Sequence, residues 1–382
     1  GLHLTQRRLT MFNPHNYQNC MFIACSSGVG SSKLHDAGYN VSAAVEILPE
    51  RWRLHRDIYD KNDECKTLLF DFAKHIPELV KIYKERQCRG IIFTLPCQPL
   101  SLAGGQHLGD YETWLFLSAL ELCQAIAKEK DAVLDFTFWE NAPYFISPNQ
   151  DEIITDRLNG ATILQYITMV MNSLGHNVNA RRINACYYGT AQSRERGIVL
   201  TQRGGRWEFP APDEKFLTIR DAIGNGKFKT LESGQRDPDD EFHRIGYINP
   251  LQAECIRHTA TGCAAVNNPP PYKFVNIDGS LCQGSHAGVA GRNDWDKPAH
   301  TIIQGSDSLC GDWTLHPGNI QPDGTYDNAR YFSVAEIFAL SGVDKRYINA
   351  ISPWARKNDK FLRELCGEAL LPNLVNRIFA NR

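Results

Sequence analysis

The feature that most constrains the fold is an alternation of short apolar runs and longer amphipathic stretches in the first half of the chain. The apolar runs are rich in β-branched and aromatic residues, which favours strands. They are MFIACSS (21–27), VSAAVEI (41–47), GIIFTL (90–95) and AVLDFTFWE (132–140). Between and after them come the helix-like stretches SSKLHDA (31–37), LSALELCQAIAKE (117–129) and TILQYITMVMNSLG (162–175). This order predicts βαβ units in a doubly wound, mostly parallel α/β sheet, with ligands at the carboxyl ends of the strands.

The second half has a different texture, and the length of 382 residues exceeds what one hydrophobic core usually holds. After about residue 204, Gly, Pro, Asp and Asn become frequent, which is typical of a loop-rich recognition surface. Helix signals return at 333–342 and 370–379. We therefore predict a catalytic and cofactor-binding domain at 18–204, completed by 346–382, and a smaller recognition domain at 205–345. The last helix is expected to dock on the first domain.

Composition excludes several classes of protein. Apolar residues make up 42% of the chain, but no run approaches the roughly 18 apolar residues of a membrane helix. The N-terminal segment lacks the apolar block of a secretory signal. Twelve cysteines are scattered and never form C-x-x-C, so we expect no metal site and reduced thiols in a cytoplasmic protein.

The formal net charge is only -2, yet one stretch is strongly basic. Residues 176–206 hold six arginines against one acid, Glu195, a local net charge of 6 − 1 = +5. The arginines are Arg181, Arg182, Arg194, Arg196, Arg203 and Arg206. Such a stretch predicts a groove for an anionic partner.

The motif LPCQPLS (95–101) directly follows a predicted strand. Cys97 stands between two prolines, on a stiffened turn where a thiolate can face a ligand. A lone cysteine is more often a small buried hydrophobe, so the accompanying motifs decide the interpretation.

Those motifs occur in one order: PCQPLS (96–101), ENA (140–142), QSRER (192–196), DKPAHTI (296–302), RYFSVAE (330–336) and GEALLP (367–372). Over about residues 21 to 380 the chain resembles the DNA cytosine-5 methyltransferase family. The resemblance implies an S-adenosylmethionine-dependent methyltransferase fold, S-adenosyl-L-methionine as cofactor and double-stranded DNA as partner. We expect a cytoplasmic monomer that associates with the nucleoid through DNA.

The resemblance assigns the chemistry to four residues. Cytosine C5 is a poor nucleophile, so a thiolate must first add to C6, and Cys97 has that role. Glu140 would assist at N3, a task for a carboxyl group with a raised pKa. Arg194 and Arg196 would hold the cytosine O2 and the DNA phosphates.

A base inside a duplex cannot reach a thiol on a sheet edge, so the target cytosine must be flipped out. The glycine-rich run LAGGQ (102–106) could close over DNA as a loop. The predicted DNA contacts are Ser101, Gln106, Gln192, Arg203 and Arg206.

The cofactor site is predicted from the turn SSGVGS (26–31), which is similar to the family's F-x-G-x-G-G element. Glu46, at the end of the second strand, would accept both ribose hydroxyls. Asp71 would contact the adenine amino group. The remaining predicted cofactor residues are Ser26, Gly28, Gly30, Pro96, Glu368 and Ala369.

Two of these residues depart from the family pattern: Ser26 stands where Phe is usual, and Glu368 where Asn is usual. Losing the aromatic ring removes stacking worth on the order of 1 kcal/mol. One alternative is therefore a modified S-adenosylmethionine that leaves a different C5 adduct. Two further alternatives are a tRNA cytosine-5 methyltransferase and a catalytically inactive DNA-binding protein. Membership of a restriction-modification system, a phage or neither stays open.

Overall fold

The computed structural model describes residues 17–61, 63–96, 100, 110–148, 160–282 and 288–382. Its centre is one seven-stranded sheet with the strand order β3-β2-β1-β4-β5-β7-β6. The strands are β1 (Gln18–Ile23), β2 (Tyr39–Glu46), β3 (Lys66–Leu69), β4 (Gly90–Phe93), β5 (Phe136–Asn141), β6 (His176–Asn184) and β7 (Glu195–Arg203). Strands β1 to β5 run parallel, whereas β7 runs antiparallel to both β5 and β6. The predicted doubly wound, mostly parallel sheet is confirmed.

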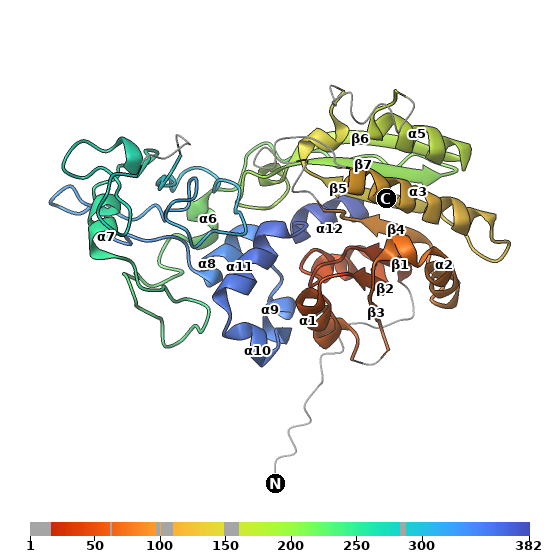
Figure 1. Ribbon diagram of the computed structural model, residues 1–382, viewed down its shortest axis with the longest axis horizontal. Helices are drawn as coiled ribbons and strands as arrows, with labels where there is room; N and C mark the ends of the chain where they lie inside the picture. The colour runs from red at the N-terminus through yellow and green to blue at the C-terminus, as the bar shows by residue number, and fades with distance from the viewer. Residues whose placement is uncertain (1–16, 62, 97–99, 101–109, 149–159, 283–287) are drawn as a thin grey trace, which may run out of the picture.

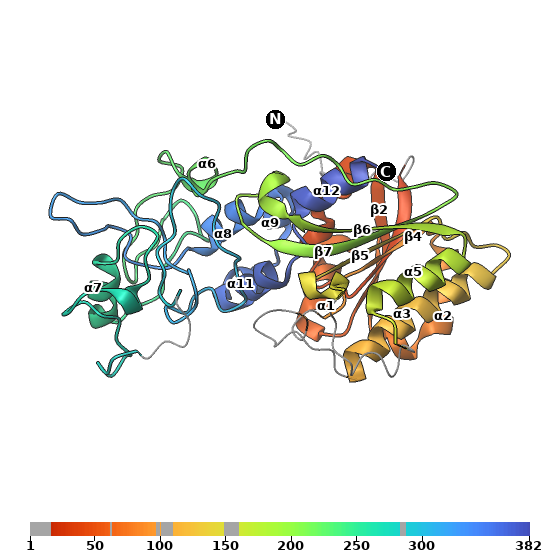
Figure 2. The same ribbon diagram turned by 90° about the horizontal axis from the view of Figure 1, so that it is seen from above.

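Both faces of the sheet are buried because successive side chains of a strand point to opposite sides. In β1, Cys20 and Phe22 belong to one core cluster, whereas Met21 and Ile23 belong to the other. The second cluster is covered by α2 (Ile76–Glu85), α3 (Asp110–Lys128) and α5 (Ile163–Ser173). Figure 2 shows these three helices side by side along the sheet.

The core cluster on the opposite face of the sheet extends to helices from the first, middle and last parts of the chain. They include α1 (Pro49–Tyr59), α6 (Ile219–Ile223), α8 (Val334–Ser341), α9 (Lys345–Ala350), α10 (Pro353–Arg356), α11 (Asp359–Glu368) and α12 (Pro372–Ala380). In α12, Phe379 packs edge-on against Tyr39 of β2 and Phe136 of β5. The Trp207 indole N–H donates to the Ile378 carbonyl at 3.0 Å. The last helix therefore docks on the first domain, as expected.

The stretch expected to form a helix at 31–37 forms two short 3-10 turns instead, Gly30–Lys33 and His35–Ala37. The hydroxyls of Ser31 and Ser32 donate to the Gly28 and Val29 carbonyls. Serine side chains that bond nearby backbone in this way compete with a regular helix.

A third core cluster lies apart from the sheet and consists of residues between Leu231 and Tyr331. We call residues 231–331 the outer region. Among its described residues the only α-helix is α7 (Pro250–Arg257), and its β-pairs are isolated bridges. Figure 1 shows this region as a loop-rich lobe at one end of the molecule, beyond α8.

The packing break lies earlier than the predicted boundary at residue 345. Helix α8 follows the outer region, yet Val334, Ile337 and Phe338 pack in the sheet-side cluster. Its apolar face is therefore part of the main core.

Two kinds of feature are missing from the described residues. No helix in that part of the chain combines the length and apolarity needed to cross a membrane. No group of three or more potential metal ligands occurs there either.

Candidate active site

Asn141, the last residue of β5, fixes the segment that leads into Cys97. Its side-chain amide donates to the Leu95 carbonyl at 3.0 Å. In the same segment, the Thr94 hydroxyl donates to the carbonyl of Ala24, the residue after β1, at 2.7 Å. Leu95 is buried and Pro96 is exposed, so the chain reaches the surface at the carboxyl edge of the sheet. Cys97 itself lies outside the described residues, as do Ser101 and Gln106.

Glu140 lies next to Asn141 at the same edge and is almost fully buried. Its Oε1 accepts from Nε of Arg196 at 2.7 Å, and the Arg196 side chain is 13% exposed. Burial raises the pKa of Glu140, whereas the two guanidinium groups of Arg196 and Arg194 act in the opposite direction. A carboxyl group whose pKa is raised by burial can hold the proton that a donor to cytosine N3 needs.

Arg194 and Gln192 have structural contacts that the sequence did not indicate. The guanidinium of Arg194 donates to the carbonyls of Ile302 at 3.0 Å and Gly367 at 2.7 Å. The amide of Gln192 accepts the Ile302 N–H at 3.0 Å and donates to the Ser341 hydroxyl at 3.2 Å. Gln192 is 0% exposed and Arg194 is 2% exposed. Their expected contacts with DNA and with cytosine O2 do not fit this burial, because both side chains point into the protein.

The direction of β7 separates the other predicted DNA-binding arginines from this edge. Since β7 is antiparallel to β5, Arg196 lies near Asn141, whereas Arg203 lies beside the start of β5. There the Arg203 N–H donates to the Asp135 carbonyl. Arg203 is thus at the opposite edge of the sheet from Glu140, and Arg206 follows three residues later.

Three other arginines of the basic stretch 176–206 have contacts within the protein. Arg182 pairs with Glu195, and Arg206 pairs with Glu208 at 2.7 Å. Arg181 lies over the Phe209 ring. In the register of β6 and β7, Arg182 lies opposite Gly197, next to Arg196, whereas Arg203 lies at the other end of β7.

The turn after β1 holds a backbone that only glycine adopts easily. Gly28 has a φ of 82°, and a Cβ there would lie 2.4 Å from the Tyr59 ring. The Tyr59 hydroxyl donates to the Gly28 carbonyl at 2.7 Å. A Cβ on Gly30 would lie 2.7 Å from Cβ of Leu370. The two predicted cofactor glycines therefore also allow the turn to pack against α1 and the segment before α12.

Glu46 ends β2 and already accepts three backbone N–H groups. Oε2 accepts from Ser26 at 2.7 Å, and Oε1 accepts from Ile47 and Leu48, both at 2.9 Å. Burial raises the pKa of Glu46 in spite of these donors. A carboxylate offers about four acceptor positions, so roughly one remains for a ribose hydroxyl, one fewer than we expected.

The two residues that depart from the family pattern touch each other. The Ser26 hydroxyl donates to Oε1 of Glu368 at 2.5 Å, although the two residues are 342 positions apart in the sequence. Arg51 of α1 donates through Nε to the same oxygen at 3.2 Å. Gln304 donates to Oε2 of Glu368 at 3.0 Å. The Glu368 carboxylate is thus paired with Arg51, which it shares with Glu364, and is held by two polar side chains.

The remaining predicted cofactor residues lie near this edge. Asp71 follows β3 and accepts the Ala73 N–H at 3.2 Å, and its carboxylate lies 3.4 Å from Nζ of Lys74. The pKa of Tyr111 is raised by burial and also by Asp71, which indicates that these two side chains are close. Ala369 is buried directly after α11.

Four residues at this edge were missed by the sequence analysis. Ile47 and Leu48 follow Glu46 and are 50% and 47% exposed, which offers apolar surface beside a carboxylate. Arg51 and Gln304 were missed because they reach this edge through contacts with Glu368, which is distant in the sequence. The position of Ile47 and Leu48 directly after a strand-end acid was an available signal, whereas no local pattern marks Gln304.

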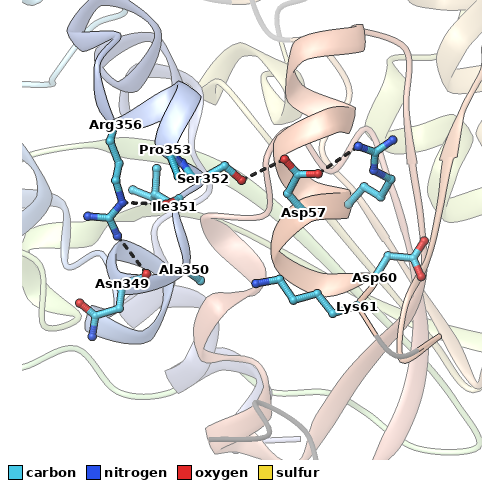
Figure 3. Close-up of a pocket in the computed structure, with 10 residues that line it drawn as sticks. Asp57, Asp60, Lys61, Asn349, Ala350, Ile351, Ser352, Pro353 and Arg356 are labelled. Carbon is cyan, nitrogen blue, oxygen red and sulfur yellow. Dashed lines mark hydrogen bonds and ion pairs between the residues drawn. The ribbon is translucent and has the colours of Figure 1, made fainter. Parts of the chain in front are cut away.

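An open cleft of about 720 Å³ lies elsewhere, between the end of α1 and the α9–α10 segment. Figure 3 shows Asp57 bonded to the Ser352 hydroxyl, and Arg356 bonded to backbone carbonyls of its own segment. The charges lining this cleft have both signs: Arg56 pairs with Asp57, whereas Arg356 pairs with Glu241 outside the lining. Because α1 begins at the carboxyl edge and ends here, the cleft is remote from Glu46 and Glu140.

A mostly parallel sheet with a glycine turn after β1, an acid that ends β2 and a buried acid next to the last residue of β5 fits the class of S-adenosylmethionine-dependent methyltransferases. The family model described as C-5 cytosine-specific DNA methylase matches residues 20–381 of this chain. The chain therefore belongs to the C-5 cytosine-specific DNA methylase family and is a DNA cytosine-5 methyltransferase.

Individual relatives agree with this membership. The chain is similar to Type II methyltransferase M1.HgaI of Avibacterium volantium, with 27% identity over 364 residues that cover 92% of this chain and 94% of the relative. It is also similar to Type II methyltransferase M.MthTI of Methanothermobacter thermautotrophicus, with 29% identity over 52% of this chain and 54% of the relative.

Among solved structures, the methyltransferase EhMeth of Entamoeba histolytica matches the fold with a TM-score of 0.61 at 13% identity. That match covers 96% of this chain and 98% of EhMeth. The Dnmt2 methyltransferase of S. pombe matches with a TM-score of 0.57 at 13% identity, covering 95% of this chain and 97% of the other.

Proposed function

We propose that this enzyme methylates C5 of a cytosine flipped out of double-stranded DNA, with Cys97 as nucleophile and Glu140 as the acid at N3. The observation that carries the proposal is the buried Glu140 carboxyl beside the Asn141 amide that fixes the base of the Cys97 segment. Glu140 and Asn141 lie at one sheet edge, so a cytosine placed there can meet both the acid and the segment that carries the nucleophile.

The proposed reaction starts with the addition of Cys97 to the cytosine ring. The Cys97 thiolate forms a bond to C6, and the π electrons of the C5–C6 bond become available at C5 while Glu140 donates its proton toward N3. C5 then takes the methyl group, and the methyl donor is left as a neutral thioether. Loss of the C5 proton to water and breaking of the sulfur–C6 bond restore the aromatic ring and free the thiolate, and N3 returns its proton to the Glu140 carboxylate. Arg196 contributes by holding the Glu140 carboxyl in place at 2.7 Å.

S-adenosyl-L-methionine supplies an electrophilic methyl group in this family. Glu46 can accept about one ribose hydroxyl in its remaining acceptor position. Ile47 and Leu48 offer the apolar surface that a flat base needs, which compensates for the aromatic ring missing at Ser26. Gly28, Gly30, Asp71, Pro96 and Ala369 complete the proposed cofactor site.

The contacts of Glu368 favour ordinary S-adenosylmethionine over a modified form. Its carboxylate is paired with Arg51 and bonded to Ser26 and Gln304. A cofactor carrying an extra charge would have to break this set. The Ser26 and Glu368 departures therefore act as one compensated pair.

We assign DNA recognition to the outer region, residues 231–331, and the catalytic domain to 18–204 with the helices that follow residue 333. The outer region has its own small core and long loops, which suits a surface that reads base edges. We propose that one chain acts alone, because the proposed catalytic groups all come from one sheet edge.

Nucleoside mass spectrometry of DNA from a methylation-free host expressing the chain tests this proposal. One extra methyl group on deoxycytidine that disappears with Cys97→Ser is the expected result. A heavier Cys97-dependent adduct would identify a modified cofactor. Modification of tRNA, or no modification at all, would contradict the proposed function.

A further inference from the structure

Residues 302–304 link the outer region to the main core. Their backbone lies directly on the end of α11, since a Cβ on Gly367 would come within 2.3 Å of the Gln304 nitrogen. Gln192 binds the Ile302 N–H, and Arg194 bridges the carbonyls of Ile302 and Gly367. This segment is therefore fixed to the core by backbone contacts that do not involve the Gln304 side chain.

The Gln304 side chain makes a separate contact that leads to the proposed cofactor turn. Its amide donates to Oε2 of Glu368, whose Oε1 accepts the Ser26 hydroxyl. The Ser26 N–H in turn donates to Glu46. A continuous series of hydrogen bonds thus joins the segment after the DKPAHTI motif to the carboxylate at the end of β2.

We propose that Gln304 is a positioning residue that couples cofactor binding to DNA binding through Glu368 and Ser26. This inference rests on the proposed function. A cofactor that orders the Ser26 turn also fixes Glu368, and Glu368 binds the side chain of Gln304 in the outer region. DNA that orders the outer region fixes Gln304, and through Glu368 it also fixes the Ser26 turn. Such coupling must be reciprocal, so each ligand tightens the binding of the other by the same factor.

Arg51 makes Glu368 suitable for this role. The guanidinium of Arg51 binds Glu368 and also Glu364 one turn earlier on α11, at 2.9 Å. It fixes the Glu368 carboxylate while Gln304 and Ser26 donate to its two oxygens. Removing the Gln304 amide takes away one donor and no charge, so the variant should fold.

The dissociation constant of S-adenosylhomocysteine tests the coupling in the full chain. It is measured by calorimetry with and without sheared genomic DNA from a methylation-free host, which contains every short sequence. We expect DNA to tighten binding by about fivefold or more in the parent protein, within the usual range of allosteric coupling. In Gln304→Ala this gain should fall below about twofold, while the DNA-free constant stays within about twofold of the parent value.

Gln124→Ala, on α3 and away from the junction, is the matched control and should keep the full gain. Ser26→Ala should lose the gain as Gln304→Ala does, because it breaks the same series of bonds. An undiminished gain in Gln304→Ala, or no gain in the parent protein, overturns the inference. Absence of Cys97-dependent methylation would instead contradict the proposed function, so the two failures are distinguishable.

Discussion

At the scale of single residues, Glu140 is subject to opposing influences. Its ion pair with Arg196 favours the carboxylate, whereas donation to cytosine N3 requires the protonated acid. Burial raises the pKa of Glu140 and so favours the form that the reaction needs. In the proposed mechanism, Arg196 orients the Glu140 carboxyl so that its proton points at the base.

Glu140→Gln tests this balance. The amide keeps the shape of the side chain but cannot transfer a proton, so the rate of single-turnover methylation should fall by about 10²- to 10⁴-fold. Activity of the parent enzyme should decline as the pH rises through the pKa of Glu140 in the complex, and the variant should lack that decline. Glu208→Gln, which alters an exposed carboxylate at the far sheet edge, should leave the rate unchanged. A rate for Glu140→Gln within about threefold of the parent would exclude the acid role.

The glycine turn offers a comparison between two left-handed residues. Gly28 and Gly38 have φ values of 82° and 86°, but only Gly28 has a neighbour where a Cβ would stand. Gly38→Ala should cost roughly 1 kcal/mol in the free energy of unfolding, from backbone strain alone. Gly28→Ala should cost about 1 to 3 kcal/mol more, because the Tyr59 ring must move. Denaturant unfolding measures both, and equal losses would contradict the packing role of Gly28.

At the scale of elements, the start of α8 is fixed by a buried ion pair. Ser333 caps the helix, and its capping partner Glu336 also binds Arg330 at 2.7 and 2.9 Å. Burial alone would raise the pKa of Glu336, but Arg330 holds it at about 2. The RYFSVAE motif therefore has a structural meaning: it joins the end of the outer region to a helix of the main core.

Glu336→Gln should cost about 3 to 5 kcal/mol in the free energy of unfolding at neutral pH, because Arg330 is left buried without its partner. The folded-state pKa of Glu336 is depressed, so its contribution is present above the unfolded value near 4.5 and is lost as the pH falls toward 2. The difference between parent and variant should therefore shrink over that range. Unfolding curves at several pH values measure it, and a difference independent of pH would contradict the assignment.

At the scale of the whole molecule, residues far apart in sequence complete one core. The cluster on the α1 side of the sheet combines β1 near the N-terminus with α12 at the C-terminus. Figure 1 shows α12 lying against the sheet, with the outer region extending away at the other end. The last helix is thus part of the catalytic domain, although the whole outer region precedes it in the sequence.

Phe379→Ala tests the contribution of α12. Phe379 is 1% exposed and meets Tyr39, Phe136 and Trp207, so truncation should cost about 3 to 5 kcal/mol in the free energy of unfolding. Phe216→Ala, at a position 38% exposed, should cost less than about 1 kcal/mol. Thermal or denaturant unfolding compares them. Similar losses in the two variants would mean that α12 packs only loosely on the sheet.

The sequence by itself determined the class of fold and the edge at which chemistry is placed. Periodic apolar runs define which segments become strands, and the motif residues Glu46, Pro96 and Glu140 lie at or near the ends of those strands. Local patterns suffice for this because strand formation and strand ends depend on neighbouring residues.

Only the tertiary structure decided which charged side chains face that edge. The antiparallel direction of β7 buries Gln192 and Arg194 against residues 302 and 367 and moves Arg203 to the opposite edge. The contact of Ser26 with Glu368 joins positions 342 residues apart, so no local pattern could predict it. Strand direction and long-range contacts depend on how the whole chain packs, and that information is not contained in any single motif.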